Sequence, residues 1–154
     1  MAIEKWVAGT VGLTWVDCIP TATLNSIASG NAILSGSNLD NSTNLDMFCD
    51  VSMVLGSITT VAPNFIGIYL YPLNKDGTTY GDGRFASSAA GPPANPYWVG
   101  NIVVPVATGA AEGILRGIIM PPGKFNFVFY NQLGVAMAAS GNTAQYRTYN
   151  RSVA

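Results

Sequence analysis

The sequence predicts an all-β protein, an antiparallel β-sandwich of about eight strands that is jelly-roll-like. Apolar and polar residues alternate in several segments, which is the period of a half-buried strand. Glycine, proline and asparagine separate these segments at the short spacing of turns, and no long stretch has a convincing helical period. The 154 residues are enough for one domain with one core.

The first third of the chain contains short apolar segments that read as strands. They cover residues 6–7, 13–19, 23–27 and 31–34. Pro20 ends the second segment, because proline lacks the N–H that a strand donates. A polar loop over residues 35–44 follows, dense in serine, asparagine and aspartate.

The clearest predicted strand covers residues 46–58. Its apolar residues occur at every second position and are Met47, Cys49, Val51, Met53 and Leu55. Asp50 and Ser52 fall on the opposite face. Because successive side chains of a strand point to opposite sides, this pattern predicts a sheet with one buried face.

The strand predicted over residues 65–71 is apolar on both faces. One face carries Phe65, Gly67, Tyr69 and Tyr71, and the other carries Ile66, Ile68 and Leu70. A strand of this kind is covered on both sides. Either another subunit or a loop of the same chain covers the aromatic face, and the pattern does not choose between them.

A long irregular segment over residues 78–96, rich in glycine and proline, follows this strand. Loops of this length in compact domains are usually functional or lie in contacts. Further strands are predicted over residues 97–106, 113–120, 124–130 and 145–151, with a shorter one over 135–139. Phe125, Phe127 and Phe129 share one face of their strand.

The composition argues against catalysis. Only 10% of residues are charged, the formal net charge is -1 and histidine is absent, so Ser-His-Asp catalysis and histidine-bearing zinc sites are excluded. The 7 scattered cations give no electrostatic footprint for nucleic acid. No apolar stretch is long enough to span a membrane without interruption. We therefore expect a protein that is not an enzyme and has no cofactor, metal, nucleic-acid partner or membrane partner.

Two narrower alternatives stay open. Asp40, Asp46 and Asp50 supply oxygen ligands of the kind that calcium prefers, although the EF-hand pattern is absent and turn formation is the favoured interpretation. Cys18 and Cys49 form either a disulfide bridge or two free thiols. Cys49 lies in the alternating apolar run, where it behaves as a small core residue.

The low charge predicts that copies of this chain or another protein cover part of the surface, because free monomers usually carry a well-charged surface. The alternative is an ordinary monomer whose surface is rich in serine, threonine and asparagine. We expect an N-terminal arm over residues 1–12 that docks on a neighbouring chain, followed by a single β-sandwich domain over residues 13–154. The candidate interface residues are aromatic or aliphatic: Ile3, Trp6, Val7, Tyr69, Tyr71, Tyr97 and Trp98.

The later part of the chain resembles a known group of proteins. The motifs are Asp76-Gly-Thr-Thr-Tyr-Gly-Asp-Gly83, Ala90-Gly-Pro-Pro-Ala-Asn-Pro-Tyr-Trp98, the stretch from Arg116 to Ala138, and Tyr146-Arg-Thr-Tyr149. With these motifs, residues 46–150 resemble the capsid decoration (cement) proteins of tailed bacteriophages and related small virion structural proteins.

This resemblance implies a jelly-roll-like β-sandwich, often a homotrimer, on the outer surface of a capsid. The implied partners are the major capsid protein and further copies of the chain. The implied location is the virion, after synthesis in the host cytoplasm, and the role is to clamp the shell against the pressure of internal DNA.

The alternative function is a receptor- or carbohydrate-binding module of a phage fibre or appendage, since jelly rolls host both functions. In that case Tyr97 and Trp98 are the best-placed pair for stacking on a sugar.

Overall fold

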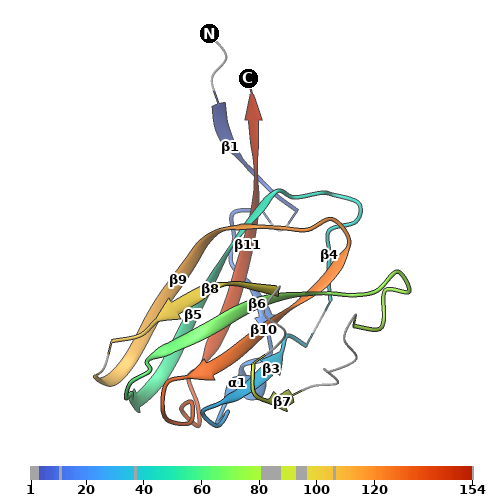
Figure 1. The fold of residues 1–154 in the computed structure, drawn as a ribbon. Coiled ribbons are helices and arrows are strands. Elements are labelled where there is room, and N and C mark those ends of the chain that lie inside the picture. Colours follow the sequence, from blue (N-terminus) through green and yellow to red (C-terminus); the bar gives the residue numbers. More distant parts are fainter. Residues whose placement is uncertain are drawn as a thin grey trace.

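A computed structural model, which describes residues 4–10, 12–36, 38–80, 88–92, 97–105 and 107–153, confirms the all-β antiparallel sandwich (Figure 1). One sheet contains β1 (Glu4–Ala8), β2 (Val16–Ile19), β5 (Phe48–Thr59), β9 (Thr108–Ile119) and β11 (Thr143–Val153). The other contains β3 (Asn31–Leu34), β4 (Leu39–Asp40), β6 (Phe65–Pro72), β7 (Ser88–Ala90), β8 (Trp98–Val103) and β10 (Lys124–Gln132). The described residues include a single helix, α1 (Thr21–Leu24).

Eight of these strands form the jelly roll. The order is β2-β11-β5-β9 in one sheet and β3-β10-β6-β8 in the other. Most strands that follow one another along the chain lie in different sheets, which is the double Greek-key path of a jelly roll. β1, β4 and β7 add to this frame by pairing with β11, β10 and β3.

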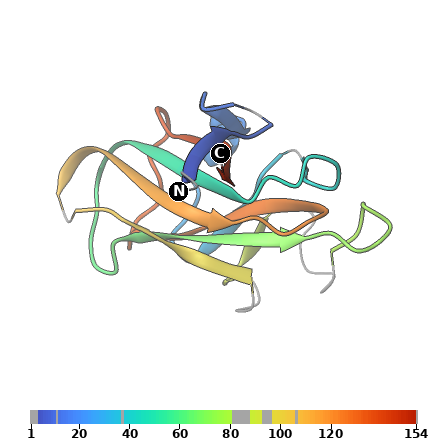
Figure 2. The ribbon, with the colours of Figure 1, turned by 90° about the horizontal axis from the view of Figure 1, so that it is seen from above.

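The core lies between the two sheets, which Figure 2 shows as two layers. Phe125, Phe127 and Phe129 of β10 are fully buried, as are Ile66 and Ile68 of β6. The opposite sheet contributes the alternate residues of β5, which are Cys49, Val51, Met53 and Leu55. The period-two pattern therefore predicted the core-facing residues 49–55 of β5 correctly, and β6 is buried on both faces, as its two apolar faces predicted.

Three segments differ from the prediction. Residues 21–24 form α1 after Pro20, where a strand was expected from residue 23. Met47 precedes β5 and is exposed, so it does not belong to the buried face. Residues 135–139 are not a strand. The amide of buried Asn131 donates to the carbonyl oxygen of Val135 at 2.9 Å, and this side chain holds the segment as a loop instead.

The chain itself covers the aromatic face of β6. Tyr71 is fully buried, with its ring centroid 5.6 Å from that of Tyr80 and 4.7 Å from that of Tyr97. Tyr69 is also buried, beside Val128. The expectation that Tyr69 and Tyr71 lie at a subunit interface is thus corrected, because both are buried within the chain and Tyr80 and Tyr97 pack against Tyr71.

The two cysteines are free and buried. Cys18 is on β2 and Cys49 on β5, and β11 lies between these strands because Ala144, Gln145 and Tyr146 pair with both. Two inter-strand spacings amount to about 9–10 Å, which exceeds the Cα separation of about 7 Å that a disulfide tolerates. The two thiols therefore cannot bridge in this fold.

β1 and the end of β11 form a two-stranded ribbon that projects from the sandwich (Figure 1). The register runs from Glu4 opposite Val153 to Ala8 opposite Tyr149. Residues 4–8 of the predicted N-terminal arm are thus a strand paired within its own chain. Ile3 lies outside the described residues. The pairing of β5 with β11 ends at Tyr149, so the ribbon beyond that residue stands clear of β5.

Candidate functional site

The outer face of the five-stranded sheet gathers aromatic and charged side chains at the base of the ribbon. Directly paired residues of antiparallel strands share a face, and the register pairs Phe48 with Tyr149 and Asp50 with Arg147. We call this surface the arginine–aromatic face and define it by Trp6, Leu13, Trp15, Phe48, Asp50, Arg116, Arg147 and Tyr149.

Asp50 is the centre of this face. The side chain of Arg147 donates from Nε and Nη2 to its Oδ2 at 3.1 and 2.9 Å, and Arg116 donates from Nη1 to the same oxygen at 3.3 Å. Its Oδ1 accepts from the hydroxyl of Tyr149 and from the backbone N–H of Gly117, both at 3.0 Å. The carboxylate is only 4% exposed, so these donors replace its water shell.

A β-bulge in β9 delivers two of these donors. Cys49 pairs with Ile118 and Val51 pairs with Leu115, so Arg116 and Gly117 both lie opposite Asp50. Gly117 has a φ of +69°, a left-handed conformation that glycine adopts without strain. The bulge turns the N–H of Gly117 out of the ladder and toward the carboxylate.

The donors keep Asp50 ionised. Partial burial acts to raise its pKa, but the N–H of Gly117, the guanidinium of Arg147 and the hydroxyl of Tyr149 outweigh it, so the pKa lies below its usual range. Burial raises the pKa of Tyr149, and its hydrogen bond to the ionised Asp50 raises it further. The cluster therefore carries one negative and two positive charges at neutral pH.

An aromatic cluster borders these charges. The ring of Trp6 lies edge-on to Phe48 and Tyr149, at centroid distances of 5.7 and 5.2 Å, while Phe48 and Tyr149 stack at 5.7 Å. The guanidinium carbon of Arg147 lies 4.8 Å from the centre of the Trp15 ring. Trp6 nevertheless remains 64% exposed, which is unusual for the largest apolar side chain.

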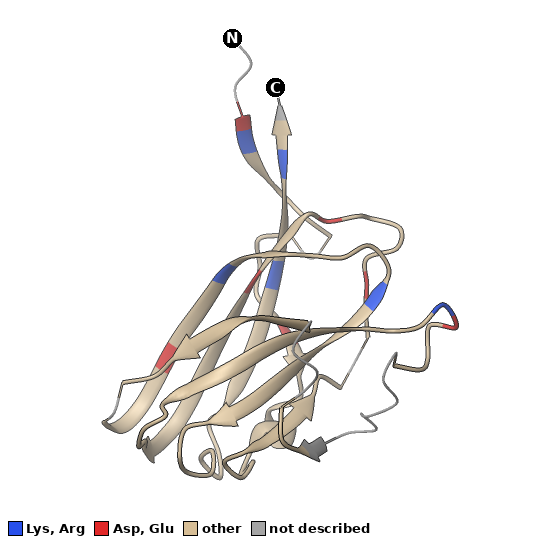
Figure 3. Ribbon diagram, viewed as in Figure 1, with Lys and Arg blue, Asp and Glu red and all other residues tan. Residues whose placement is uncertain are grey.

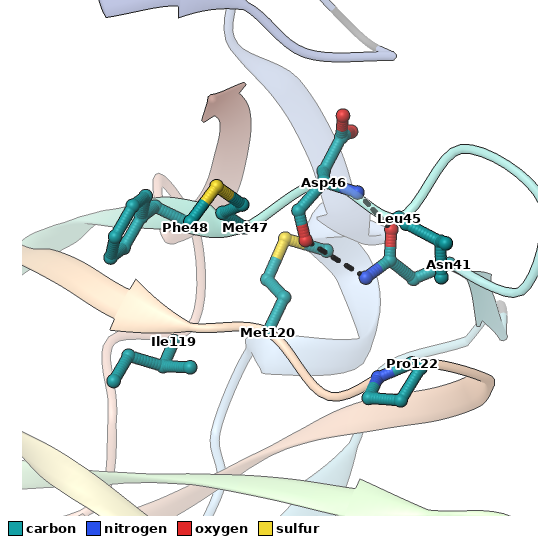
Figure 4. A pocket seen from close by; sticks show the side chains of 8 residues that line it. All are labelled: Asn41, Leu45, Asp46, Met47, Phe48, Ile119, Met120 and Pro122. Atoms are coloured by element: carbon teal, nitrogen blue, oxygen red, sulfur yellow. Dashed lines mark hydrogen bonds between the residues drawn. The ribbon is translucent and has the colours of Figure 1, made fainter. Parts of the chain in front are cut away.

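Two hollows of about 390 Å³ each open beside the stacked Phe48 and Tyr149. Trp6, Leu13, Asp50, Arg116, Arg147 and Tyr149 line the first, which we call the arginine hollow. The second is more apolar (Figure 4), and its lining includes Leu45, Met47, Phe48 and Ile119. Of ten exposed large hydrophobic residues in the described part of the chain, five line these two hollows: Trp6, Leu13, Leu45, Met47 and Ile119.

The ribbon coloured by charge is mostly neutral (Figure 3), and three of its charged residues, Asp50, Arg116 and Arg147, meet on this face. Three of the four arginines of the chain, which are Arg116, Arg147 and Arg151, lie on β9 and β11. Arg151 forms an ion pair with Glu4 across the ribbon. Asp50 neutralises one of the other two arginines, so the arginine hollow has a surplus of one positive charge.

Among the predicted interface residues, only Trp6 belongs to this face. Val7 is partly buried on the ribbon. Tyr97 packs against buried Tyr71, whereas Trp98 is 49% exposed and its indole N–H donates to Asn101 at 3.0 Å. Tyr97 is thus part of an aromatic core cluster, and Trp98 is left as the exposed member of the pair.

The three aspartates considered for calcium have separate partners. Asp40 accepts from Ser42 and pairs with Lys124, and buried Asp46 accepts from the backbone of Thr10 at 2.7 Å. Asp50 is held by arginine. Within the described ranges, no three histidine, cysteine, aspartate or glutamate side chains are gathered to hold a metal ion.

The sequence prediction missed Phe48, Arg116, Arg147 and Tyr149, and it placed Asp50 on an open face. The alternation of Phe48 with Asp50, and of Arg147 with Tyr149, does put each pair on one face of its strand. What the sequence does not contain is the pairing of β5 with β11 and the bulge in β9, which together bury the carboxylate.

No protein-family model matches this chain, and no curated protein matches it. The described residues contain no helix that is both long and apolar enough to cross a membrane.

Proposed function

We propose that this protein is a structural virion protein, which decorates and stabilises a bacteriophage capsid by binding the outer surface of major capsid subunits through the arginine–aromatic face. The observation that carries the proposal is the exposure of Trp6, which lines the arginine hollow together with Arg116. Tryptophan, tyrosine and arginine are the residues enriched at the energetic centres of protein interfaces.

Clustering of exposed apolar residues supports a binding role. Single exposed apolar side chains are normal on a monomer, but a contiguous patch indicates an interaction surface. Phe48 lines one hollow and Tyr149, which stacks on it, lines the other, so one partner can contact both hollows. Burying a side chain such as Ile119 gains about 1.5–3 kcal/mol, and many copies around a shell multiply this gain.

The resemblance of residues 46–150 to capsid decoration proteins supplies the identity of the partner. The fold is compatible with that identity, because jelly rolls are common in viral capsid proteins. The small fraction of charged residues, 10%, also suits a protein that forms a permanent assembly.

Co-sedimentation with undecorated capsids tests the proposal. The wild-type protein is expected to pellet with capsids, and Trp6→Ala is expected to weaken binding at least tenfold. The matched control is Trp98→Ala, which removes an exposed tryptophan from the other sheet and should bind like the wild type. Wild-type protein that stays in the supernatant, or equal binding by Trp6→Ala, contradicts the proposal.

The second candidate is a carbohydrate-binding module. The observation that favours it is the arginine hollow, where an aromatic wall and polar groups meet in the manner of a sugar site. A glycan array decides between the two functions: glycan binding that is lost in Trp6→Ala, without binding to capsids, favours the carbohydrate-binding module.

A further inference from the structure

The two arginines beside Asp50 differ in their hydrogen bonds and in their exposure. Arg147 donates two hydrogen bonds to the carboxylate, lies against Trp15 and has a side chain only 27% exposed. Arg116 makes one longer contact with the carboxylate, at 3.3 Å, and its side chain is 60% exposed. Arg147 is therefore the arginine that neutralises Asp50, and Arg116 is the surplus cation.

Arg116 also has unused hydrogen-bonding capacity. A guanidinium carries five N–H donors in a planar fork. Among the described residues, Arg116 forms its hydrogen bond and ion pair with Asp50 alone. The bulge at Gly117 and the contact with Asp50 hold its head at the edge of the arginine hollow. The group is thus placed to accept a second anion from outside the chain.

The walls of the hollow define what accompanies that anion. Trp6, Leu13 and Tyr149 line it beside the arginines, and both Trp6 and Leu13 are exposed. A ligand that fills the hollow covers these apolar groups and excludes water from Arg116, which strengthens the charge interaction. The hollow therefore suits an anionic group attached to an apolar segment.

A carboxylate fits the charge better than a phosphate does. One surplus positive charge balances a single negative charge, whereas a phosphate dianion would face the carboxylate of Asp50 with one charge in excess. The fork of arginine also matches the two oxygens of a carboxylate.

We propose that Arg116 anchors an aspartate or glutamate side chain of the partner protein in the arginine hollow, with an apolar residue of the partner packed on Trp6 and Leu13. This inference rests on the proposed function, because a capsid subunit is the partner that supplies the acidic side chain. Arg116 is then the residue that sets the register of the complex.

The site can be tested on the isolated protein with sodium hexanoate, which joins a carboxylate to an apolar chain. NMR titration should shift the indole N–H signal of Trp6 in a saturable way. Hexanamide, which has the same shape without the charge, should bind at least fivefold more weakly. Equal affinity for hexanoate and hexanamide overturns the proposal.

The variant Arg116→Gln should lose the preference for hexanoate, while Lys124→Gln, which changes a cation of the other sheet, should keep it. Asp50 retains its bonds to Arg147, Tyr149 and Gly117 in Arg116→Gln, so this variant should fold, and an unchanged circular dichroism spectrum checks that it does. Undiminished hexanoate binding by Arg116→Gln overturns the assignment of the site.

Capsid binding separates this inference from the proposed function. Arg116→Gln should bind capsids at least tenfold more weakly than the wild type, and Arg116→Lys should lie between them because lysine keeps the charge without the fork. Equal capsid binding by wild type and Arg116→Gln overturns the inference and leaves the proposed function standing. Absence of capsid binding by the wild type contradicts the proposed function, whereas Arg116-dependent hexanoate binding still supports a carboxylate site.

Discussion

Asp50 joins three strands of the five-stranded sheet through one buried carboxylate. It lies on β5, receives Arg116 and Gly117 from β9, and receives Arg147 and Tyr149 from β11. A charge in this position is stabilising only while its partners remain, because an unpaired buried charge is costly. The arrangement of the arginine–aromatic face therefore depends on this residue.

Replacing the carboxylate by an amide tests that dependence. Asp50→Asn keeps the shape but removes the negative charge between two arginines, and we expect it to lower the free energy of unfolding by about 2–4 kcal/mol. Urea unfolding measures the loss. The control is Asp17→Asn, which alters an exposed carboxylate and should stay within about 0.5 kcal/mol of the wild type. Equal losses in the two variants would show that Asp50 has no special role.

Asp50 also makes the free energy of unfolding depend on pH in the acidic range. Its folded-state pKa lies below the value of about 3.9 expected for an unfolded chain. The stabilisation is therefore complete above that unfolded value and is lost as the pH falls through the folded-state pKa. Between about pH 5 and about pH 2, the free energy of unfolding should fall more steeply for the wild type than for Asp50→Asn. Parallel curves from urea unfolding across this range contradict the prediction.

The two thiols test whether β11 lies between β2 and β5. Cys18 and Cys49 are buried, burial raises the pKa of each thiol, and β11 separates them. A thiol reagent should label neither rapidly in the native protein and both in urea, with or without prior reduction. Mass spectrometry counts the labels. Labelling in urea that requires a reductant would mean that the cysteines are bridged and the strand order is different.

Among the strands, the sequence predicted β5 and β10 well because their packing follows from the period of two, and it predicted β6 because an apolar run is buried on both faces. Phe125, Phe127 and Phe129 point inward since every second residue of a strand faces the same layer. The cover over Tyr71 could not be predicted, because Tyr80 and Tyr97 reach it from a segment with no periodic pattern.

The ribbon of β1 and β11 was predictable only in part, for a related reason. Trp6 and Val7 show that a short strand begins the chain, but the partner of that strand lies about 140 residues away, near Tyr149. Non-local pairing of this kind leaves no local signal in the sequence. The same holds for the site, since the bulge opposite Asp50 is a property of two strands together.

Removing residues 1–8 tests the role of the ribbon. β1 (Glu4–Ala8) lies outside the eight-stranded jelly roll, and a two-stranded ribbon adds little stability by itself. We expect the truncated protein to fold with a melting temperature lowered by at most about 5 °C, and to bind capsids at least tenfold more weakly because Trp6 is lost. Calorimetry and co-sedimentation measure the two effects, and full capsid affinity of the truncated protein would exclude a role for the ribbon in binding.

At the scale of the whole molecule, the sparse charge has a definite distribution. The chain has few charges to keep its surface solvated, yet two of its arginines meet at one buried aspartate beside exposed Trp6. On the opposite sheet, Tyr80 and Tyr97 of the same chain pack against the cluster that contains buried Tyr69 and Tyr71. The aromatic residues of the six-stranded sheet are therefore covered within the chain, whereas those of the arginine–aromatic face are available to a partner.

The oligomeric state of the whole protein can be predicted as well. The resemblance to capsid decoration proteins predicts a homotrimer, with a mass three times the 16.1 kDa of one chain. Light scattering on the purified protein measures that mass directly. A monomer at all accessible concentrations would contradict the homotrimer. Copies of the protein would then come together only when they bind to the capsid.

Electron cryomicroscopy of capsids mixed with the protein tests whether the arginine–aromatic face binds a capsid, because the map shows which sheet faces the shell. We expect density on the outer capsid surface with Trp6 and Arg116 buried against capsid subunits and Trp98 facing away from them. Capsids without added density, or a protein that contacts the shell through the sheet of β6 and β8, would contradict this expectation.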